Sequence, residues 1–187
     1  MAEDPRQVRT RVALTGALLE LLEAKTFVSI SVSQLCEVAG VHRTTFYKHA
    51  GSIEEFAVDV ITRELDAIAT VAADGDNPLG EYRSAMVDVL EHVASERTLY
   101  RPLLVSKWGA ALRTAIDQRM QPRVRIALDV FAAQGDVTVP DHREEIVAFI
   151  SGGLVGTIVA WALSDDTDAV AWATRVQALM PVWWPVR

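Results

Sequence analysis

The chain has 187 residues, of which half are apolar and 23% are charged, and its formal net charge is −7. This length and composition allow a substantial hydrophobic core and argue against a disordered protein. The single cysteine, Cys36, excludes an internal disulfide framework, and no apolar signal segment precedes the charged start, so we expect a cytoplasmic protein.

Apolar side chains recur at helical spacing along the chain, and no segment has the alternation typical of a strand. The predicted fold class is therefore all-α. The first predicted helix spans residues 6–25, and we expect Phe27 to anchor the turn that follows it. The apolar arc of this helix consists of Val8, Val12, Leu14, Leu18, Leu19 and Leu22.

Residues 31–56 are predicted to form two short helices joined by a tight turn, with a third helix directly after them. Ser31 and Gln34 have the spacing of a capping box, and Gly40 can take the positive φ that ends a helix. The second helix, residues 43–49, carries arginine, threonine, tyrosine, lysine and histidine but no acid. Such a helix suits the acidic, hydrogen-bonding floor of a DNA groove, and the pattern indicates a helix-turn-helix.

The residues that define this pattern are Val32, Leu35, Ala39, Gly40, Val41, Thr45, Phe46, Tyr47, Lys48 and His49. Together they resemble the DNA-binding domain of the TetR/AcrR family of transcriptional regulators, over residues 6–60. The resemblance implies an all-helical homodimer, often with a small effector in its C-terminal domain. Three positions depart from the family pattern: His42 replaces a serine cap, Ala50 replaces a phenylalanine, and Ile53 replaces a lysine that contacts phosphate.

The resemblance also implies how the helix would contact a palindromic, double-stranded DNA operator. Arg43 and Thr44 are carried over as contacts to base edges, and the neighbouring polar residues as contacts to phosphates. The whole predicted DNA-binding set is Ser31, Ser33, Arg43, Thr44, Thr45, Tyr47, Lys48 and His49.

The negative net charge is unusual for a protein that binds DNA, because phosphate contacts normally need a basic surface. Residues 1–60 hold six Lys/Arg against eight Asp/Glu, but no acid lies between Val38 and Ile53. Over a screening length of about 8 Å, this local charge matters more than the distant total. We therefore expect weak non-specific binding that is sensitive to salt.

The remainder of the chain is predicted to be a run of helices over residues 53–73, 79–94, 97–105, 108–134, 141–163 and 168–184. Loops are expected at residues 74–77 and 135–136, and a bend at Pro122, which lacks a backbone donor. The predicted division is a DNA-binding domain over residues 1–52 and an effector and dimerisation domain over residues 53–187. The helix over residues 53–73 would carry an effector-induced shift from the second domain to the first.

Large apolar and aromatic side chains on the middle helices are candidates for lining a cavity that takes a small apolar or aromatic effector. The alternative is that they are ordinary core residues. They are Tyr82, Met86, Tyr100, Leu103, Trp108, Met120, Phe131 and Trp161.

The helix ending at Leu163 is apolar on all sides from Ile146 onwards, with Gly152 and Gly156 four residues apart. It is long enough to cross a membrane, but nothing else in the chain suggests a membrane protein. We instead predict that this helix and the one over residues 168–184 pack against their copies in a homodimer.

No arrangement of residues indicates an enzyme, a cofactor or a metal site. Cys36 lies on the inward stripe of its helix, and His42 and His49 have no further metal ligands nearby in the sequence. The predicted function is a sequence-specific, DNA-binding transcriptional regulator, specifically a repressor released by an effector. The alternative is a protein-interaction dimer of the same fold that has lost DNA binding.

Overall fold

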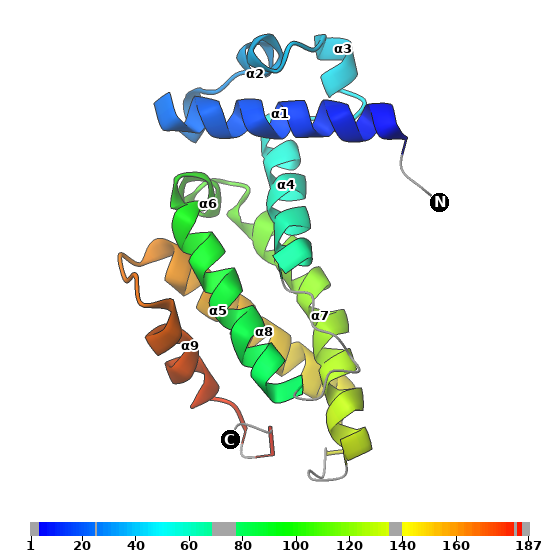
Figure 1. Cartoon of the computed structure of the whole chain (residues 1–187), viewed down its shortest axis with the longest axis vertical. Coiled ribbons are helices and arrows are strands. Elements are labelled where there is room, and N and C mark those ends of the chain that lie inside the picture. Colours follow the sequence, from blue (N-terminus) through cyan, green and yellow to red (C-terminus); the bar gives the residue numbers. More distant parts are fainter. Residues whose placement is uncertain (1–3, 25, 69–77, 135–139, 182, 185–187) are drawn as a thin grey trace.

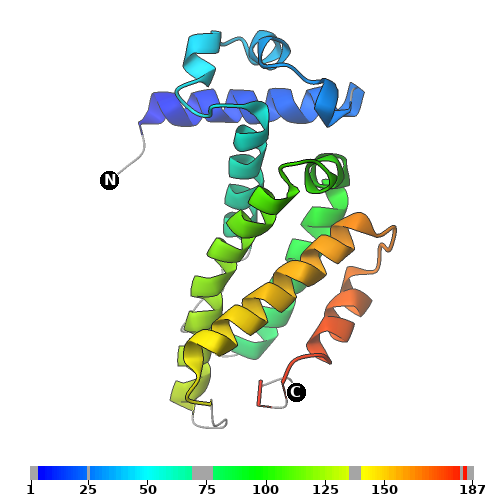
Figure 2. The same ribbon diagram turned by 180° about the vertical axis from the view of Figure 1, so that it is seen from behind.

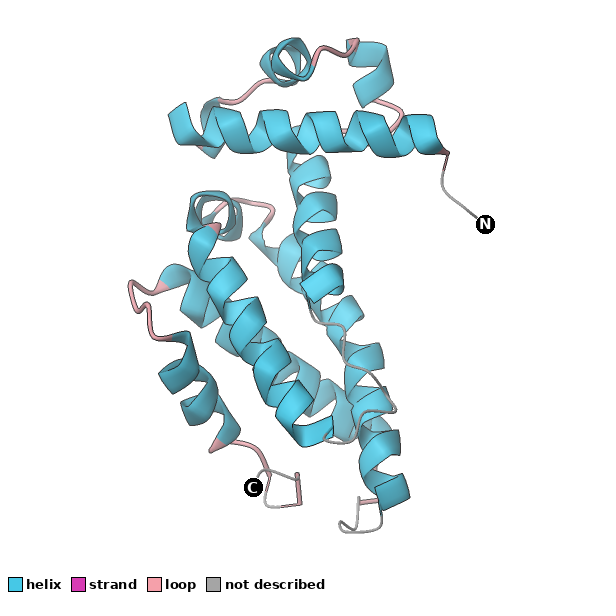
Figure 3. Ribbon diagram, viewed as in Figure 1, coloured by secondary structure: helices cyan, strands magenta, loops and turns pink. Residues whose placement is uncertain are grey.

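A computed structural model of the protein describes residues 4–24, 26–68, 78–134, 140–181 and 183–184. Within these residues every regular element is a helix and none is a strand, which confirms the predicted all-α fold class (Figure 3). The helices form a small N-terminal layer and a larger C-terminal body, with one long helix running between them (Figure 1).

The N-terminal layer comprises α1 (Pro5–Ala24), the short 3₁₀ helix η1 (Phe27–Ser29), α2 (Val32–Ala39) and α3 (Arg43–Phe46). In Figure 1, α1 lies across the top of the body, and α2 and α3 lie above α1, on the side that faces away from the body. Leu14, Leu18 and Leu22 of α1 are buried, and Phe27 is buried beside them, as predicted.

Val8 and Val12 were wrongly assigned to the core face of α1. Their side chains are 37% and 66% exposed. The buried residues of α1 all lie at or beyond Leu14, so helical spacing continues in the sequence past the part of α1 that the rest of the protein covers.

The connecting helix α4 (Ile53–Ile68) descends from the N-terminal layer along the body, next to α7 (Figure 1). Phe56, Val60, Ile61 and Leu65 are buried along one face of this helix. The final residues expected in this helix, 69–73, lie outside the described residues, and so do the loops expected at 74–77 and 135–136.

The body comprises α5 (Pro78–Ser95), α6 (Arg97–Val105), α7 (Gly109–Gln134), α8 (Arg143–Leu163) and α9 (Ala169–Gln177). Four of these helices begin and end within two residues of their predicted bounds, and α7 continues through Pro122. The last helix is the exception, since it ends at Gln177 rather than at residue 184. Pro181 explains the difference, because proline has no backbone N–H and disfavours helical geometry in the residue before it.

Trp161 on α8 holds three helices of the body together. It is fully buried, its Nε1 donates to the carbonyl of Leu90 at 2.6 Å, and the guanidinium of Arg97 lies 4.8 Å from its ring centroid. Arg101 donates from Nε to the carbonyl of Ala162 at 2.9 Å. The end of α8 is thereby fixed to α5 and α6, and the carbonyls of Trp161 and Ala162 accept hydrogen bonds from the two arginines.

Candidate DNA-binding surface and effector cavity

Both ends of α2 are fixed by residues close to them in the sequence. The Ser31 hydroxyl accepts from the backbone N–H of Gln34 at 3.3 Å, and the Gln34 side chain accepts from the backbone N–H of Ser31 at 3.0 Å. Gly40 ends α2 with φ of +65°, a conformation that costs glycine little. The predicted capping box and left-handed turn are both present.

The second helix is shorter than predicted. α3 ends at Phe46, and residues 47–49 continue as hydrogen-bonded turns. The N–H groups of Lys48 and His49 donate to carbonyls three residues back, at 3.1 and 2.8 Å, which tightens the final turn. His42 begins α3 without a side-chain cap, so this departure from the family pattern removes one stabilising hydrogen bond at the helix start.

The helices α2 and α3 lie at the tip of the molecule, at the end farthest from the body (Figure 1). The exposed members of the predicted DNA-binding set are Ser31, Ser33, Arg43, Thr44, Tyr47 and Lys48, and the half-buried ones are Thr45 and His49. A hydrogen bond to Tyr47 raises the pKa of the Arg43 guanidinium, which keeps that group cationic.

Phe46 anchors the exposed segment to the core. Its ring is fully buried and packs edge-on against Tyr47 and Phe56, with centroid distances of 5.5 and 5.9 Å. Cys36 is also buried, and burial raises the pKa of its thiol, so the cysteine acts as a small core residue rather than as a nucleophile.

The other two departures from the family pattern both fall in the core. Ala50 and Ile53 are 5% and 6% exposed. The side chain of Ile53 therefore cannot contact a phosphate. In place of a lysine, α4 begins with a cap: the Ser52 hydroxyl accepts from the N–H of Glu55 at 3.1 Å, and the Glu55 carboxylate accepts from the N–H of Gly51 at 2.9 Å.

Comparison with known proteins finds relatives among regulators of this architecture. The chain is 28% identical over 190 residues to the HTH-type transcriptional regulator TcmR of Streptomyces glaucescens, covering 92% of this chain and 84% of that protein. It is 23% identical over 161 residues to the uncharacterized HTH-type transcriptional regulator YxbF of Bacillus subtilis (strain 168), covering 83% of this chain but only 40% of that protein. No family model matches the chain.

Among solved structures, the dihydroxyacetone kinase operon activator DhaS superposes with a TM-score of 0.69, covering 91% of this chain and 93% of that one at 13% identity. This likeness shows the fold. The relatives are named as transcriptional regulators rather than as enzymes, and together with the exposed helix-turn-helix they indicate a DNA-binding transcriptional regulator. With the residues of the recognition segment (residues 31–49), the relatives above support the resemblance of the chain to regulators of the TetR/AcrR family.

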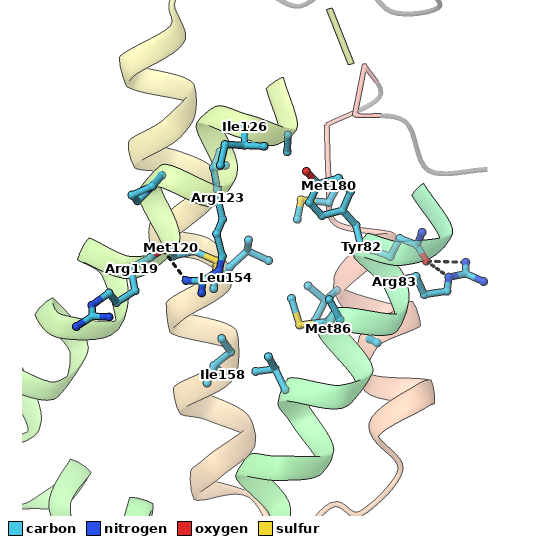
Figure 4. Close-up of a pocket in the computed structure, with 18 of the residues that line it drawn as sticks. Tyr82, Arg83, Met86, Arg119, Met120, Arg123, Ile126, Leu154, Ile158 and Met180 are labelled. Atoms are coloured by element: carbon cyan, nitrogen blue, oxygen red, sulfur yellow. Dashed lines mark hydrogen bonds between the residues drawn. The ribbon is translucent and has the colours of Figure 1, made fainter. Parts of the chain in front are cut away.

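The body contains a cavity of about 490 Å³ between α5 and α7, with α8 and α9 at its back. Figure 4 shows Met120, Arg123 and Ile126 on one wall, Tyr82 and Met86 on the opposite wall, and Leu154 and Ile158 between them. The arrangement offers a mostly apolar, half-open cavity of the size that small-molecule sites have.

Only three of the eight predicted effector residues line this cavity: Tyr82, Met86 and Met120. The lining does not include the fully buried residues Tyr100, Leu103, Phe131 and Trp161. The ring of Phe131 packs edge-on against two lining residues, Tyr82 and Trp184, with centroid distances of 5.7 and 5.0 Å. Trp108 lines a different hollow, between the body and the N-terminal layer, beside Phe27 and Lys107. A large apolar side chain at helical spacing fills the core more often than it lines a cavity.

The sequence interpretation missed the charged residues of the cavity, which are Asp66, Arg83, Arg119 and Arg123. Arg119 and Arg123 are one helical turn apart, so their shared face could have been found from spacing alone. Asp66 could not, because it comes from α4 and meets the two arginines only through the packing of α4 on α7.

A second pair of ionisable groups joins α4 to the body. Glu64 Oε2 lies 3.5 Å from Nε2 of His92 on α5. Burial raises the pKa of the Glu64 carboxyl, and the nearby charge of Glu96 raises it further. Burial lowers the pKa of the His92 imidazole. Both neutral forms are therefore favoured in the folded protein.

One face of α8 is left uncovered by the rest of the chain. In Figure 2, α8 crosses the near side of the body and no described helix lies over it. Phe149 is 72% exposed on this face, and a methyl group added at Gly152, Gly153 or Gly156 would meet nothing within 4 Å. Among the described helices, α8 alone is long and apolar enough to cross a membrane, and half of its apolar window is buried within the protein.

Proposed function

We propose that the protein is a homodimeric repressor that binds a palindromic operator through α2 and α3 and is released by a small effector in the cavity of the body. The observation that carries this proposal is the acid-free, exposed segment at the tip of the molecule, anchored from beneath by Phe46.

In this proposal Arg43 and Thr44 contact base edges, because both are exposed at the start of α3 and have the donors that the major groove reads. Tyr47 and Lys48 contact phosphates from the turn that follows, and Ser31 and Ser33 do so from the start of α2. Thr45 and His49 are half-buried, so we assign them a smaller share of the binding.

The exposed face of α8 supports the homodimer. Its glycines allow close approach of a second helix, and Phe149 and Val170 leave apolar surface for a partner to cover. An isologous contact of α8 and α9 with their copies would place two recognition segments on one side of the assembly. Segments about 34 Å apart would reach successive major grooves, which requires a palindromic operator.

The cavity and α4 support control by an effector. One helix enters the N-terminal layer at Ile53 and reaches the cavity at Asp66. A ligand that shifts the lower end of α4 would change the position of the DNA-binding tip, and a coupling of about 1–3 kcal/mol is typical of such systems. DhaS is named an activator, so repression and activation must be distinguished for this fold. Expression of a reporter gene under the operator, with and without the protein, makes this distinction.

Selection of binding sites from random double-stranded DNA, followed by mobility shift at several salt concentrations, tests this function. We expect a palindromic site and a dimer on the DNA. Lys48→Ala should weaken all sequences alike and reduce the salt slope by about one for each phosphate that is no longer neutralised, whereas Arg43→Ala should relax the sequence preference. Arg113→Ala, an exposed change on α7, is the matched control and should leave binding unchanged.

Recovery of no preferred sequence from the selection would contradict DNA recognition and favour a protein-interaction dimer of the same fold. Thermal melting of each variant separates weaker DNA recognition from unfolding of the protein.

A further inference from the structure

The turn after α9 contributes to the wall of the cavity. Among the described lining residues, Met180 and Trp184 are the two that lie outside a helix. The chain leaves α9 at Gln177, and the backbone N–H of Trp184 donates to the carbonyl of Pro181 at 2.8 Å, which closes a turn. This turn brings the ring of Trp184 to the cavity, next to walls formed by helices that are distant in the sequence.

A buried ring on α7 supports Trp184 from behind. Phe131 is fully buried, and its ring lies edge-on to that of Trp184 with the two centroids 5.0 Å apart. The ring of Tyr82, on α5, packs edge-on against the same phenylalanine at a centroid distance of 5.7 Å. Tyr82 and Trp184 both line the cavity. One part of the lining therefore consists of two aromatic rings held close together by a third.

The methionines of the lining are also suited to an aromatic ligand. Met86 on α5, Met120 on α7 and Met180 in the turn all line the cavity. A thioether sulfur makes favourable contacts with aromatic rings, and the flexible methionine side chain adapts to the shape of its neighbour. A pair of aromatic rings likewise gains more than the burial of its area alone. A flat aromatic molecule would gain from both kinds of contact, whereas a saturated molecule of the same size would gain only from burial.

We propose that Trp184 makes the cavity selective for a flat aromatic effector, because its ring contacts an aromatic ring system of the ligand. The inference rests on the proposed effector cavity, and it specifies the ligand class and the residue that selects it. The neighbouring Trp183 does not line the cavity, although its ring centroid lies 6.2 Å from that of Trp184. The selectivity is therefore assigned to one of two adjacent tryptophans.

Two compounds with the same carbon skeleton and a single hydroxyl group test the ligand class: 2-naphthol, which is aromatic, and trans-decahydro-2-naphthol, which is saturated. Calorimetric titration of the whole chain measures the affinity for each compound. We expect 2-naphthol to bind about tenfold more tightly. Equal affinity for the two compounds, or failure of 2-naphthol to bind, would overturn the proposal.

Trp184→Leu should weaken 2-naphthol about tenfold and leave the saturated compound within about twofold of its original affinity, because leucine keeps apolar surface but has no ring. Binding of the saturated compound shows that the cavity is intact. Trp184→Phe retains a ring and should retain most of the preference. Trp183→Leu is the matched control and should retain all of it. A full preference for 2-naphthol in Trp184→Leu would contradict the assigned residue.

The NMR resonances of the indole N–H groups of the five tryptophans locate the bound compound. The resonance that is missing from Trp184→Leu should move when 2-naphthol is added, whereas that of Trp161, which is fully buried and does not line the cavity, should stay in place. Binding that leaves the Trp184 resonance unmoved would overturn the proposal. These measurements need no DNA, so failure to recover an operator would contradict only the proposed function, and equal affinity for the two compounds would leave operator binding standing.

Discussion

The N-terminal layer and the body differ in how they pack their side chains. At the tip, a few polar side chains must stand in solvent, and they are held there by a helix cap, one left-handed glycine and the buried ring of Phe46. In the body, large side chains such as Tyr100 and Trp161 are fully buried in the core, and a cavity lies beside this core, between α5 and α7. Rigid anchoring suits a surface that reads DNA, whereas an incompletely filled body can admit a ligand and move.

Substitution of Phe46 should have the largest effect on stability. Phe46→Ala should destabilise the protein by about 3–5 kcal/mol, because a fully buried ring is removed from a small domain. Denaturant unfolding measures this decrease. Tyr47→Ala is the matched control: its ring is 51% exposed, so a decrease of equal size there would contradict the anchoring role of Phe46.

The exposed face of α8 provides the next test. Phe149→Glu should weaken self-association by at least about 2 kcal/mol, because it places a charge in an apolar contact. Analytical ultracentrifugation over a concentration series measures the change. Val28→Glu alters a similarly exposed valine on η1, away from α8, and should leave association intact. A chain that remains dimeric after Phe149→Glu would need another interface.

Gly40 and Gly16 isolate the effect of backbone conformation on stability, since an added methyl group would meet no neighbouring atom at either position. Gly40→Ala should cost about 1–2 kcal/mol, because only its φ of +65° opposes a side chain. Gly16→Ala, inside α1, should instead stabilise by about 0.5–1 kcal/mol. Thermal unfolding reports both values, and a stabilising Gly40→Ala would contradict the described turn.

Glu64 gives the smallest expected effect. Its folded pKa is raised by burial, so the folded protein holds this proton more tightly than the unfolded chain does. Stability contributed by the neutral form is present at low pH and is lost as the pH rises through the folded pKa. Glu64→Gln should therefore raise Tm at pH 8, by roughly 2–4 °C for about 1 kcal/mol, with a smaller gain near pH 5.

His92 has the opposite sign, because burial lowers its pKa in the folded state. Its neutral form stabilises the protein above its unfolded pKa, and that contribution is lost as the pH falls. His92→Gln should thus flatten the acid side of the stability curve, whereas Glu64→Gln flattens the alkaline side. A lower Tm for Glu64→Gln at pH 8 would show that the ionised carboxylate stabilises the fold through His92.

The recognition segment could be predicted because its signals are local. The Ser31 cap, the turn at Gly40 and the inward position of Phe46 each depend on residues within one or two helical turns. The predicted end of α3 at His49 was wrong because hydrogen bonds three residues back tighten its last turn. The position of Ile53 in the core, rather than near phosphate, was visible only in the packed structure.

The amino-acid sequence alone determined the helical class, most helix bounds and the polar surface of the tip, since helical periodicity and capping act over a few residues. Only the tertiary structure decided which large side chains of the body fill the core and which border the cavity. It also decided that Asp66 meets Arg119 and Arg123, and that one face of α8 stays uncovered. These features depend on how helices distant in the sequence are rotated against one another, which no local spacing specifies.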